Sequence, residues 1–181
     1  AKGVTGGRRG YKGALFEGGI GVPFLARWPG KIAAGAVDKR SVISAVDLLP
    51  TFCEIAGVAL PSSYVPDGVS QVRALMGEAQ PPRKNPLFWK MQAAWPPRKT
   101  RPDHWVSYAI VDQHWKLVTN KDASHRELFD LNADPFEKRD LKSENPAIVD
   151  QLGKKLEQWK ATLPLKPTGD VFSKERVSSD Q

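Results

Sequence analysis

The sequence has little of what several common kinds of site require. Its 181 residues include one cysteine, Cys53, and three histidines. A single cysteine excludes an internal disulfide framework and any zinc site built from several cysteines. No apolar run approaches the roughly 18 residues of a membrane-spanning helix. At 40% hydrophobic and 26% charged residues, the composition is that of a globular protein with one moderate core.

Positive charge exceeds negative charge by seven, and it is unevenly distributed along the chain. Residues 1–40 hold eight basic and two acidic residues, and residues 81–102 hold six basic residues and no acidic one. Two such segments can form one surface that attracts an anion, either a nucleic acid or a small sulfate or phosphate. An ordinary solvated basic face explains the same charge, so the composition leaves the anion open.

The first half of the chain contains patterns for one strand and two helices. The apolar run Val22–Trp28 predicts a buried or edge strand. Asp47 precedes apolar residues at helical spacing and Gly57 follows them, which predicts a helix with Asp47 as its cap. A shorter helix is expected over residues 70–76.

The second half has the pattern of a sheet covered by a helix. Asn145-Pro146 begins a run of apolar residues at helical spacing that continues to Leu163. The 13-residue loop Gln92–His104, between the first two strands, is long enough to serve binding. The expected strands cover residues 87–91, 105–111, 115–119 and 127–131.

The common catalytic motifs are missing from the sequence. The three histidines are ten and eleven residues apart, so no helical turn brings two of them together as metal ligands. Cys53 lies inside the expected apolar helix, which predicts a buried structural thiol. Asp130 and Asp134 are typical of turn and capping chemistry. The segment Gly6–Gly13 has flexible backbone and three cations, which suits an anion, but it lacks the spacing of a P-loop.

Several motifs occur in an order that resembles the type I sulfatases. Arg9-Gly-Tyr-Lys-Gly-Ala-Leu-Phe-Glu-Gly-Gly-Ile20 and Arg27-Trp-Pro-Gly-Lys-Ile32 are similar to the second signature region of that family. Val46-Asp-Leu-Leu-Pro-Thr51, Glu127-Leu-Phe-Asp-Leu131 and Asp134-Pro-Phe-Glu-Lys138 resemble segments that follow it. The likeness is to the C-terminal portion of proteins such as arylsulfatases and N-acetylgalactosamine-6-sulfatases.

The resemblance implies an α/β fold class, as part of an alkaline-phosphatase-like sulfatase fold. Residues 1–80 are expected to be the C-terminal part of the catalytic α/β domain. Residues 81–164 are expected to form a C-terminal subdomain with a small antiparallel sheet and a C-terminal helix. Residues 165–181 are expected to be a polar tail.

The resemblance also implies an enzyme that hydrolyses sulfate esters of carbohydrates. The family uses a formylglycine nucleophile and a divalent metal, usually calcium. Cys53 is followed by Glu-Ile-Ala rather than by the x-Pro-x-Arg from which that nucleophile is made. We therefore expect the nucleophile and the metal ligands to lie in a missing N-terminal part of the same protein, and this chain alone to be inactive.

Lys12 matches the lysine with which the family contacts the substrate sulfate. Glu17, followed by two glycines, matches an acidic turn for which we expect a structural role. By analogy with carbohydrate sulfatases, five residues of the second half are candidates for substrate specificity: Arg98, Lys99, Arg101, His104 and Trp105. The expected partner is a sulfated small molecule or glycan, with no nucleic acid and no membrane, in a periplasmic or secreted protein.

Other functions remain open on the sequence alone. Lys12 could also serve a phosphate or phosphonate ester hydrolase of the same superfamily. The basic segments suit a nucleic-acid-binding module, whose affinity would fall steeply with salt. Trp95 and Trp105 suit a module that binds sugars.

Overall fold

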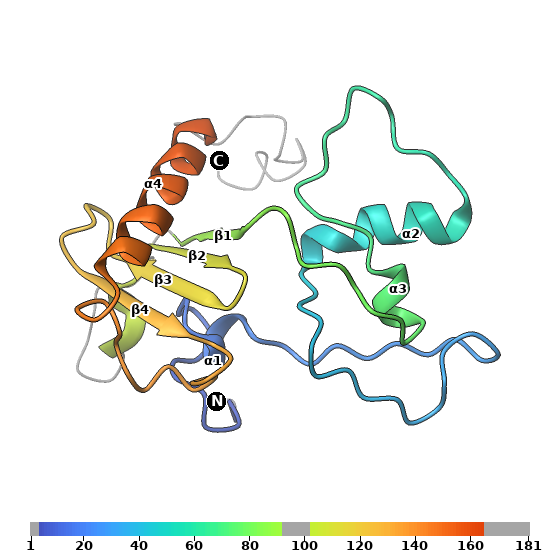
Figure 1. Cartoon of the computed structure of the whole chain (residues 1–181), viewed down its shortest axis with the longest axis horizontal. Helices are drawn as coiled ribbons and strands as arrows, with labels where there is room; N and C mark the ends of the chain where they lie inside the picture. Colours follow the sequence, from blue (N-terminus) through green and yellow to red (C-terminus); the bar gives the residue numbers. More distant parts are fainter. Residues whose placement is uncertain (1–3, 92–101, 165–181) are drawn as a thin grey trace, which may run out of the picture.

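The computed structural model describes residues 4–91 and 102–164 (Figure 1). A four-stranded sheet with the long helix α4 lies on one side of the molecule, and a loop-rich part with α2 and α3 lies on the other. The elements are α1 (Glu17–Ile20), α2 (Leu48–Ala56), α3 (Val72–Leu75), β1 (Leu87–Lys90), β2 (Tyr108–Asp112), β3 (Trp115–Thr119), β4 (Arg126–Asp130) and α4 (Pro146–Thr162), with 3-10 turns at Ala45–Asp47 and Pro102–Trp105.

The sheet is antiparallel throughout, and each strand pairs with the next in sequence. In the register, Leu117 of β3 lies opposite Ile110 of β2 and Leu128 of β4. Because side chains alternate along a strand, these three residues share one face. On that face they pack against α4, which contributes Val149, Leu152 and Leu156.

The other face of the sheet is covered by a segment from the beginning of the chain. Ala109, Val118 and Phe129 of the sheet form one buried cluster with Ala14, Leu15, Phe16 and Val106. The sheet is therefore the middle of three layers, with α4 on one face and residues 14–16 on the other. This packing fixes the segment just after Lys12 to the sheet, although the two are about a hundred residues apart in sequence.

The expected antiparallel sheet and C-terminal helix are confirmed, with small shifts at the boundaries. The strand expected from Trp105 begins at Tyr108, because Pro102–Trp105 forms a 3-10 turn first. The strand expected over Glu127–Leu131 lies one residue earlier. The tail from residue 165 and most of the Gln92–His104 loop lie outside the described residues.

The strand expected over Val22–Trp28 is wrong. Within the described range 4–91 this segment is irregular, and the side chains of Val22 and Leu25 are 79% and 93% exposed. The backbone N–H and C=O groups of a strand need a neighbouring strand as their hydrogen-bond partner. No strand lies beside this segment in the part of the chain that the structure describes.

The helix expected after Asp47 is confirmed as α2, which ends at Gly57 with a left-handed φ of 67°. Asp47 does not cap it with its side chain. That carboxylate is instead fully buried, accepts hydrogen bonds from the backbone N–H groups of Ser44 and Val69, and pairs with Arg83. The same helix leaves Cys53 half-buried rather than buried.

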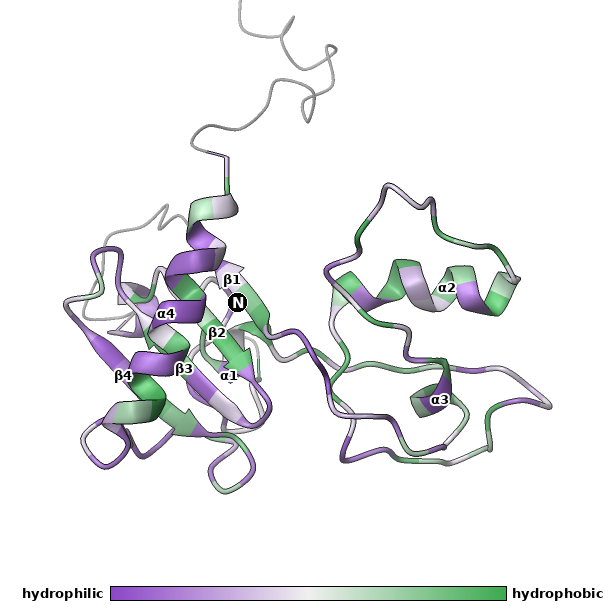
Figure 2. Ribbon diagram, turned by 45° about the horizontal axis from the view of Figure 1, so that its top comes forward, coloured by the Kyte–Doolittle hydropathy of each residue, from purple (hydrophilic) through white to green (hydrophobic). Residues whose placement is uncertain are grey.

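Figure 2 shows many hydrophobic residues along α2 and the loops around it, in the loop-rich part with α2 and α3, which we term the α2 part. Leu49, Phe52 and Ile55 of α2 are exposed, as are several large apolar residues of the flanking loops. None of the helices in residues 4–91 and 102–164 is long and apolar enough to cross a membrane.

Candidate functional site

Lys12 is exposed at the tip of a closed loop, residues 9–17, which we term the Lys12 loop. Its base is closed by a hydrogen bond from the N–H of Gly18 to the carbonyl oxygen of Arg9, at 2.7 Å. At the tip, the N–H of Ala14 donates to the carbonyl of Tyr11. Gly13 has a φ of 92°, a conformation that favours glycine, so the sharp turn beside Lys12 depends on it.

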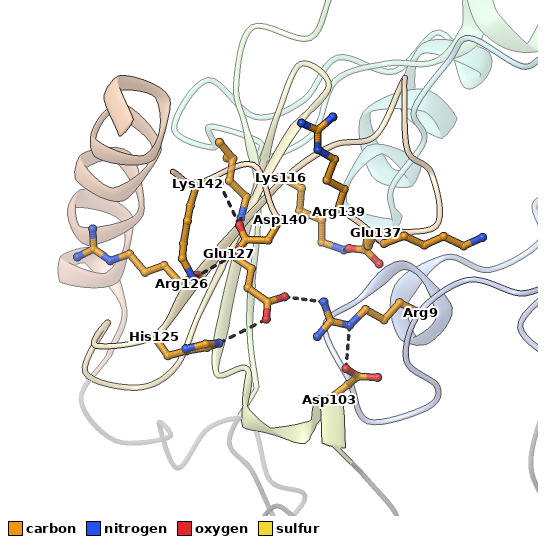
Figure 3. A network of polar contacts seen from close by, with 12 residues as sticks. Arg9, Asp103, Lys116, His125, Arg126, Glu127, Glu137, Arg139, Asp140 and Lys142 are labelled. Carbon is orange, nitrogen blue, oxygen red and sulfur yellow. Dashed lines mark hydrogen bonds and ion pairs between the residues drawn. The ribbon is translucent and has the colours of Figure 1, made fainter. Parts of the chain in front are cut away.

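Arg9 anchors the first side of the loop to the sheet side of the molecule (Figure 3). Its Nε donates to Asp103 at 2.8 Å and its Nη1 donates to Glu127 at 2.5 Å. Burial disfavours the charged guanidinium, but the two carboxylates outweigh this effect and raise the pKa of Arg9 above its ordinary value. Arg9 is therefore occupied as an anchor, whereas Lys12 faces solvent.

A second group of charges anchors the other side of the loop. Lys116 of β3 and Glu137 are both buried, and their Nζ and Oε1 atoms lie 2.7 Å apart (Figure 3). Lys116 Nζ also donates to Glu17 Oε1 at 2.9 Å. The backbone N–H of Glu17 donates to Glu137 Oε2 at 2.6 Å. Burial raises the pKa of Glu137, although Lys116 acts in the opposite direction.

Two of the five predicted specificity residues can be placed, and both lie close to the Lys12 loop. The His104 ring is buried and lies 5.1 Å from the Tyr11 ring, and its Cε1 is 3.2 Å from where a Cβ on Gly13 would be. Trp105 packs edge-to-face on Phe16. Arg98, Lys99 and Arg101 lie outside the described residues, and the assignment of all five to specificity stays a prediction.

The described part of the chain offers no cluster of side chains suited to a metal ion. In residues 4–91 and 102–164, no group of three or more His, Cys, Asp or Glu side chains could hold a metal ion. The acidic residues nearest the Lys12 loop are engaged by cations, since Arg9 pairs with Asp103 and Glu127, and Lys116 pairs with Glu17 and Glu137.

The sequence predicted Lys12 and a structural role for Glu17, but it gave no sign of the partner of Glu17. Lys116 lies in an expected strand as a single charged residue among apolar ones, a pattern that is usual for an outward-facing side chain. The structure buries it completely. The acids at the expected turn behave as predicted, because Asp130 and Asp134 accept hydrogen bonds from backbone N–H groups of the residues that follow them.

Comparisons with known proteins place the whole arrangement in one family. Residues 9–162 match the family model described as N-sulphoglucosamine sulphohydrolase, C-terminal. A sulfatase of Formosa agariphila is 34% identical over 157 residues, which are 82% of this chain and 28% of that protein. An N-acetylgalactosamine-6-O-sulfatase of Bacteroides thetaiotaomicron is 25% identical over 166 residues, covering 84% of this chain and 30% of that protein.

A solved structure agrees with these matches. The crystal structure of Ps i-CgsB in complex with k-i-k-neocarrahexaose superposes with a TM-score of 0.68 at 28% identity. The superposed region covers 83% of this chain and 31% of the Ps i-CgsB chain. The expected sulfatase fold is therefore confirmed, and this chain spans about 30% of the length of its relatives.

Proposed function

The chain belongs to the family of N-sulphoglucosamine sulphohydrolase C-terminal domains and matches the C-terminal portion of sulfatases; from this premise we propose that the full-length protein hydrolyses sulfate esters and that Lys12 contacts the sulfate. The observation that carries the proposal is the geometry of the Lys12 loop. Its neighbouring cation Arg9 is fixed to two carboxylates, while the ammonium of Lys12 is exposed at the tip of a loop anchored on both sides.

The chemistry of this lysine suits the proposed role. An ammonium donates strong hydrogen bonds to an anionic oxygen, and a fixed cation stabilises negative charge that develops on the leaving oxygen. We propose that the formylglycine nucleophile and a divalent metal, calcium in our proposal, are supplied by the rest of the full-length protein. On this proposal the chain alone does not turn over a sulfate ester.

We further propose that the substrate is a sulfated carbohydrate. The names of two relatives support this class: one is an N-acetylgalactosamine-6-O-sulfatase, and Ps i-CgsB was crystallised with k-i-k-neocarrahexaose. Basic and aromatic side chains suit an anionic sugar, and Arg98, Lys99, Arg101, His104 and Trp105 are the proposed specificity residues. Of these, His104 and Trp105 lie close to the Lys12 loop. A periplasmic or secreted location is part of the same proposal.

The exposed apolar surface of the α2 part supports the proposal that the N-terminal part of the same protein packs on it. Leu25 and Val65 are 93% and 86% exposed, and Phe52 of α2 is 59% exposed. Soluble monomers rarely leave such an extended apolar surface uncovered. Since the relatives are about three times longer than this chain, the remainder of the protein is long enough to cover it.

The test uses the full-length protein and two esters, 4-nitrophenyl sulfate and 4-nitrophenyl phosphate. We expect turnover of the sulfate ester, and a loss of about 100-fold or more in kcat/KM on Lys12→Ala, the loss typical when a group that stabilises developing negative charge is removed. Lys154→Ala, which removes an exposed lysine on α4, is the matched control and is expected to change kcat/KM less than twofold.

Two results would contradict the proposal. The first is a Lys12→Ala variant with the kcat/KM of the parent protein. The second is a parent protein that prefers the phosphate ester, which would favour the phosphate and phosphonate ester hydrolases of the same superfamily.

A further inference from the structure

A buried ion pair, Lys116 with Glu137, contacts the end of the Lys12 loop and has no role in the proposed chemistry. The side chain of Lys116 is completely buried and Glu137 is 1% exposed. Their nearest charged atoms are 2.7 Å apart. The two residues that follow Lys116 along β3, Leu117 and Val118, are apolar and fully buried.

Placing this pair here is unfavourable in two ways. A buried ion pair loses the hydration of both charges, and well-packed apolar side chains of similar volume often stabilise a fold as well or better. Glu137 also has a φ of 56°, in the left-handed region that residues other than glycine seldom adopt. Strained conformations that persist at one point of a fold are grounds for a functional hypothesis.

The pair makes its contacts with Glu17, where the Lys12 loop ends. Glu137 Oε2 accepts the backbone N–H of Glu17 at 2.6 Å, and Lys116 Nζ donates to the Glu17 carboxylate at 2.9 Å. The buried pair thus holds both the backbone and the side chain of Glu17. The next residue, Gly18, donates its N–H to Arg9 on the opposite side of the loop.

We propose that Lys116 and Glu137 are positioning residues that hold the Lys12 loop, and with it the Lys12 ammonium, in the orientation that meets the sulfate. The proposal rests on the proposed function of Lys12. The two anchors of the loop then have different roles. Arg9 connects the loop to Asp103 and Glu127, whereas the buried pair fixes the position of Glu17, at the end of the loop.

A double-mutant cycle in the full-length protein tests this role. With 4-nitrophenyl sulfate as substrate, we expect Lys116→Met combined with Glu137→Met to lower kcat/KM about 10- to 100-fold. In a Lys12→Ala background the same pair of substitutions is expected to lower it less than twofold, because residues that act through one another are not additive. Losses that multiply independently would overturn the proposal.

The paired substitution is chosen because it keeps the protein folded. Replacing both partners with apolar side chains of similar volume leaves no unpaired charge at the two buried positions. Glu17, whose side chain is 18% exposed, loses Lys116 but keeps Arg8 at 3.6 Å. The Tm is therefore expected to stay within a few degrees of that of the parent protein. A second variant, Glu137→Gln, keeps an oxygen for the Glu17 N–H, and we expect it to lose only 2- to 10-fold in kcat/KM.

Hydrogen exchange supplies a readout that does not depend on turnover. The paired variant is expected to exchange the amide protons of Glu17 and Gly18 at least tenfold faster, with α2 unchanged. Asp112→Asn is the control. It breaks the ion pair between Asp112 of β2 and Lys155 of α4, whose charged atoms lie 2.5 Å apart, and this pair does not involve the Lys12 loop. Unchanged exchange in the paired variant overturns the positioning role, whereas unchanged turnover in Lys12→Ala overturns the proposed function.

Discussion

The guanidinium carbon of Arg9 lies 3.9 Å from the centroid of the Phe16 ring. The two residues stand on either side of Lys12, so this cation–π contact draws together the two sides of the Lys12 loop. Phe16 is fully buried against the sheet, and Arg9 also reaches Asp103 and Glu127. Lys12 is thus a flexible side chain on a backbone that is held closely at both sides.

Arg9→Lys is expected to destabilise the protein by about 1–2 kcal/mol, because an ammonium cannot reproduce the two-pronged guanidinium contact or its stacking on an aromatic ring. Arg139→Lys is the matched control. Arg139 pairs with Glu144 at the surface, where both side chains are more than half exposed, and such pairs contribute about 0–1 kcal/mol. Urea unfolding of both variants measures the difference, and equal losses would contradict the anchoring role of Arg9.

Gly19→Ala is expected to destabilise the protein by about 2 kcal/mol or more, since overpacking against backbone forces the chain to shift. A Cβ at this position would lie 2.1 Å from the carbonyl oxygen of Ala14, inside the Lys12 loop. Gly153→Ala in α4 is the opposite case, because a Cβ there would lie 3.6 Å from its nearest neighbour, the Nη1 of Arg126. We expect it to stabilise the helix by about 0.5–1 kcal/mol. Thermal unfolding of the two variants should give shifts of opposite sign.

The elements that the sequence predicted well are those whose signal is local. Helix α4 has its proline, its helical spacing and its charged outer face within one segment, and β3 has a turn directly before it. The Val22–Trp28 strand failed because its apolar run carries no information on whether a second strand lies beside it. An apolar run of this length is equally compatible with an extended segment, as the structure has it.

The sequence supplies candidate site residues only where a motif carries them. Lys12 and Glu17 stand in one contiguous segment that resembles a known signature. Lys116 and Glu137 meet Glu17 from positions about a hundred residues or more away, and periodicity in sequence does not reveal such contacts. A charged residue in a strand is usually exposed, so the burial of Lys116 could be found only in three dimensions.

Asp47→Ala is expected to destabilise the α2 part by about 3 kcal/mol, because it leaves the largely buried guanidinium of Arg83, whose side chain is 12% exposed, without its carboxylate. The backbone N–H groups of Ser44 and Val69 lose their acceptor as well. Asp38→Ala, at an exposed turn, is the control and should cost less than about 1 kcal/mol. Hydrogen exchange over residues 44–83 measures the effect, and similar exchange in the two variants would contradict it.

Leu25→Asp in the full-length protein tests whether the apolar surface of the α2 part is covered. Leu25 is 93% exposed here, so a substitution without a covering partner would change stability by less than about 0.5 kcal/mol. If the N-terminal part packs on it, a buried unpaired carboxylate should destabilise the protein by several kcal/mol. Lys39→Asp, which changes an exposed polar residue of the same part, is the control. Equal Tm values for the two variants would argue against the proposed interface.

Asp134 and Glu137 belong to one turn but are expected to give opposite pH dependence. Burial tends to raise the pKa of Asp134, but the N–H groups of Arg139, Lys138 and Phe136 outweigh it and lower the pKa below its ordinary 3.8. Its contribution to stability is therefore complete above pH 3.8 and is lost as the pH falls through the lowered pKa. Asp134→Ala should cost about 1 kcal/mol at pH 7, through three lost exposed backbone hydrogen bonds, and less in acid.

For Glu137, burial raises the pKa above its ordinary 4.5, so the folded state binds more protons than the unfolded state just above that pH. As the pH rises from 4.5 through the raised pKa, the parent protein should lose stability relative to Glu137→Gln, which does not titrate. The measurement is the free energy of unfolding of the parent and both variants between pH 3 and pH 7. The parent-minus-variant difference should rise with pH for Asp134→Ala and fall for Glu137→Gln, and slopes of the same sign would contradict the buried placement of Glu137.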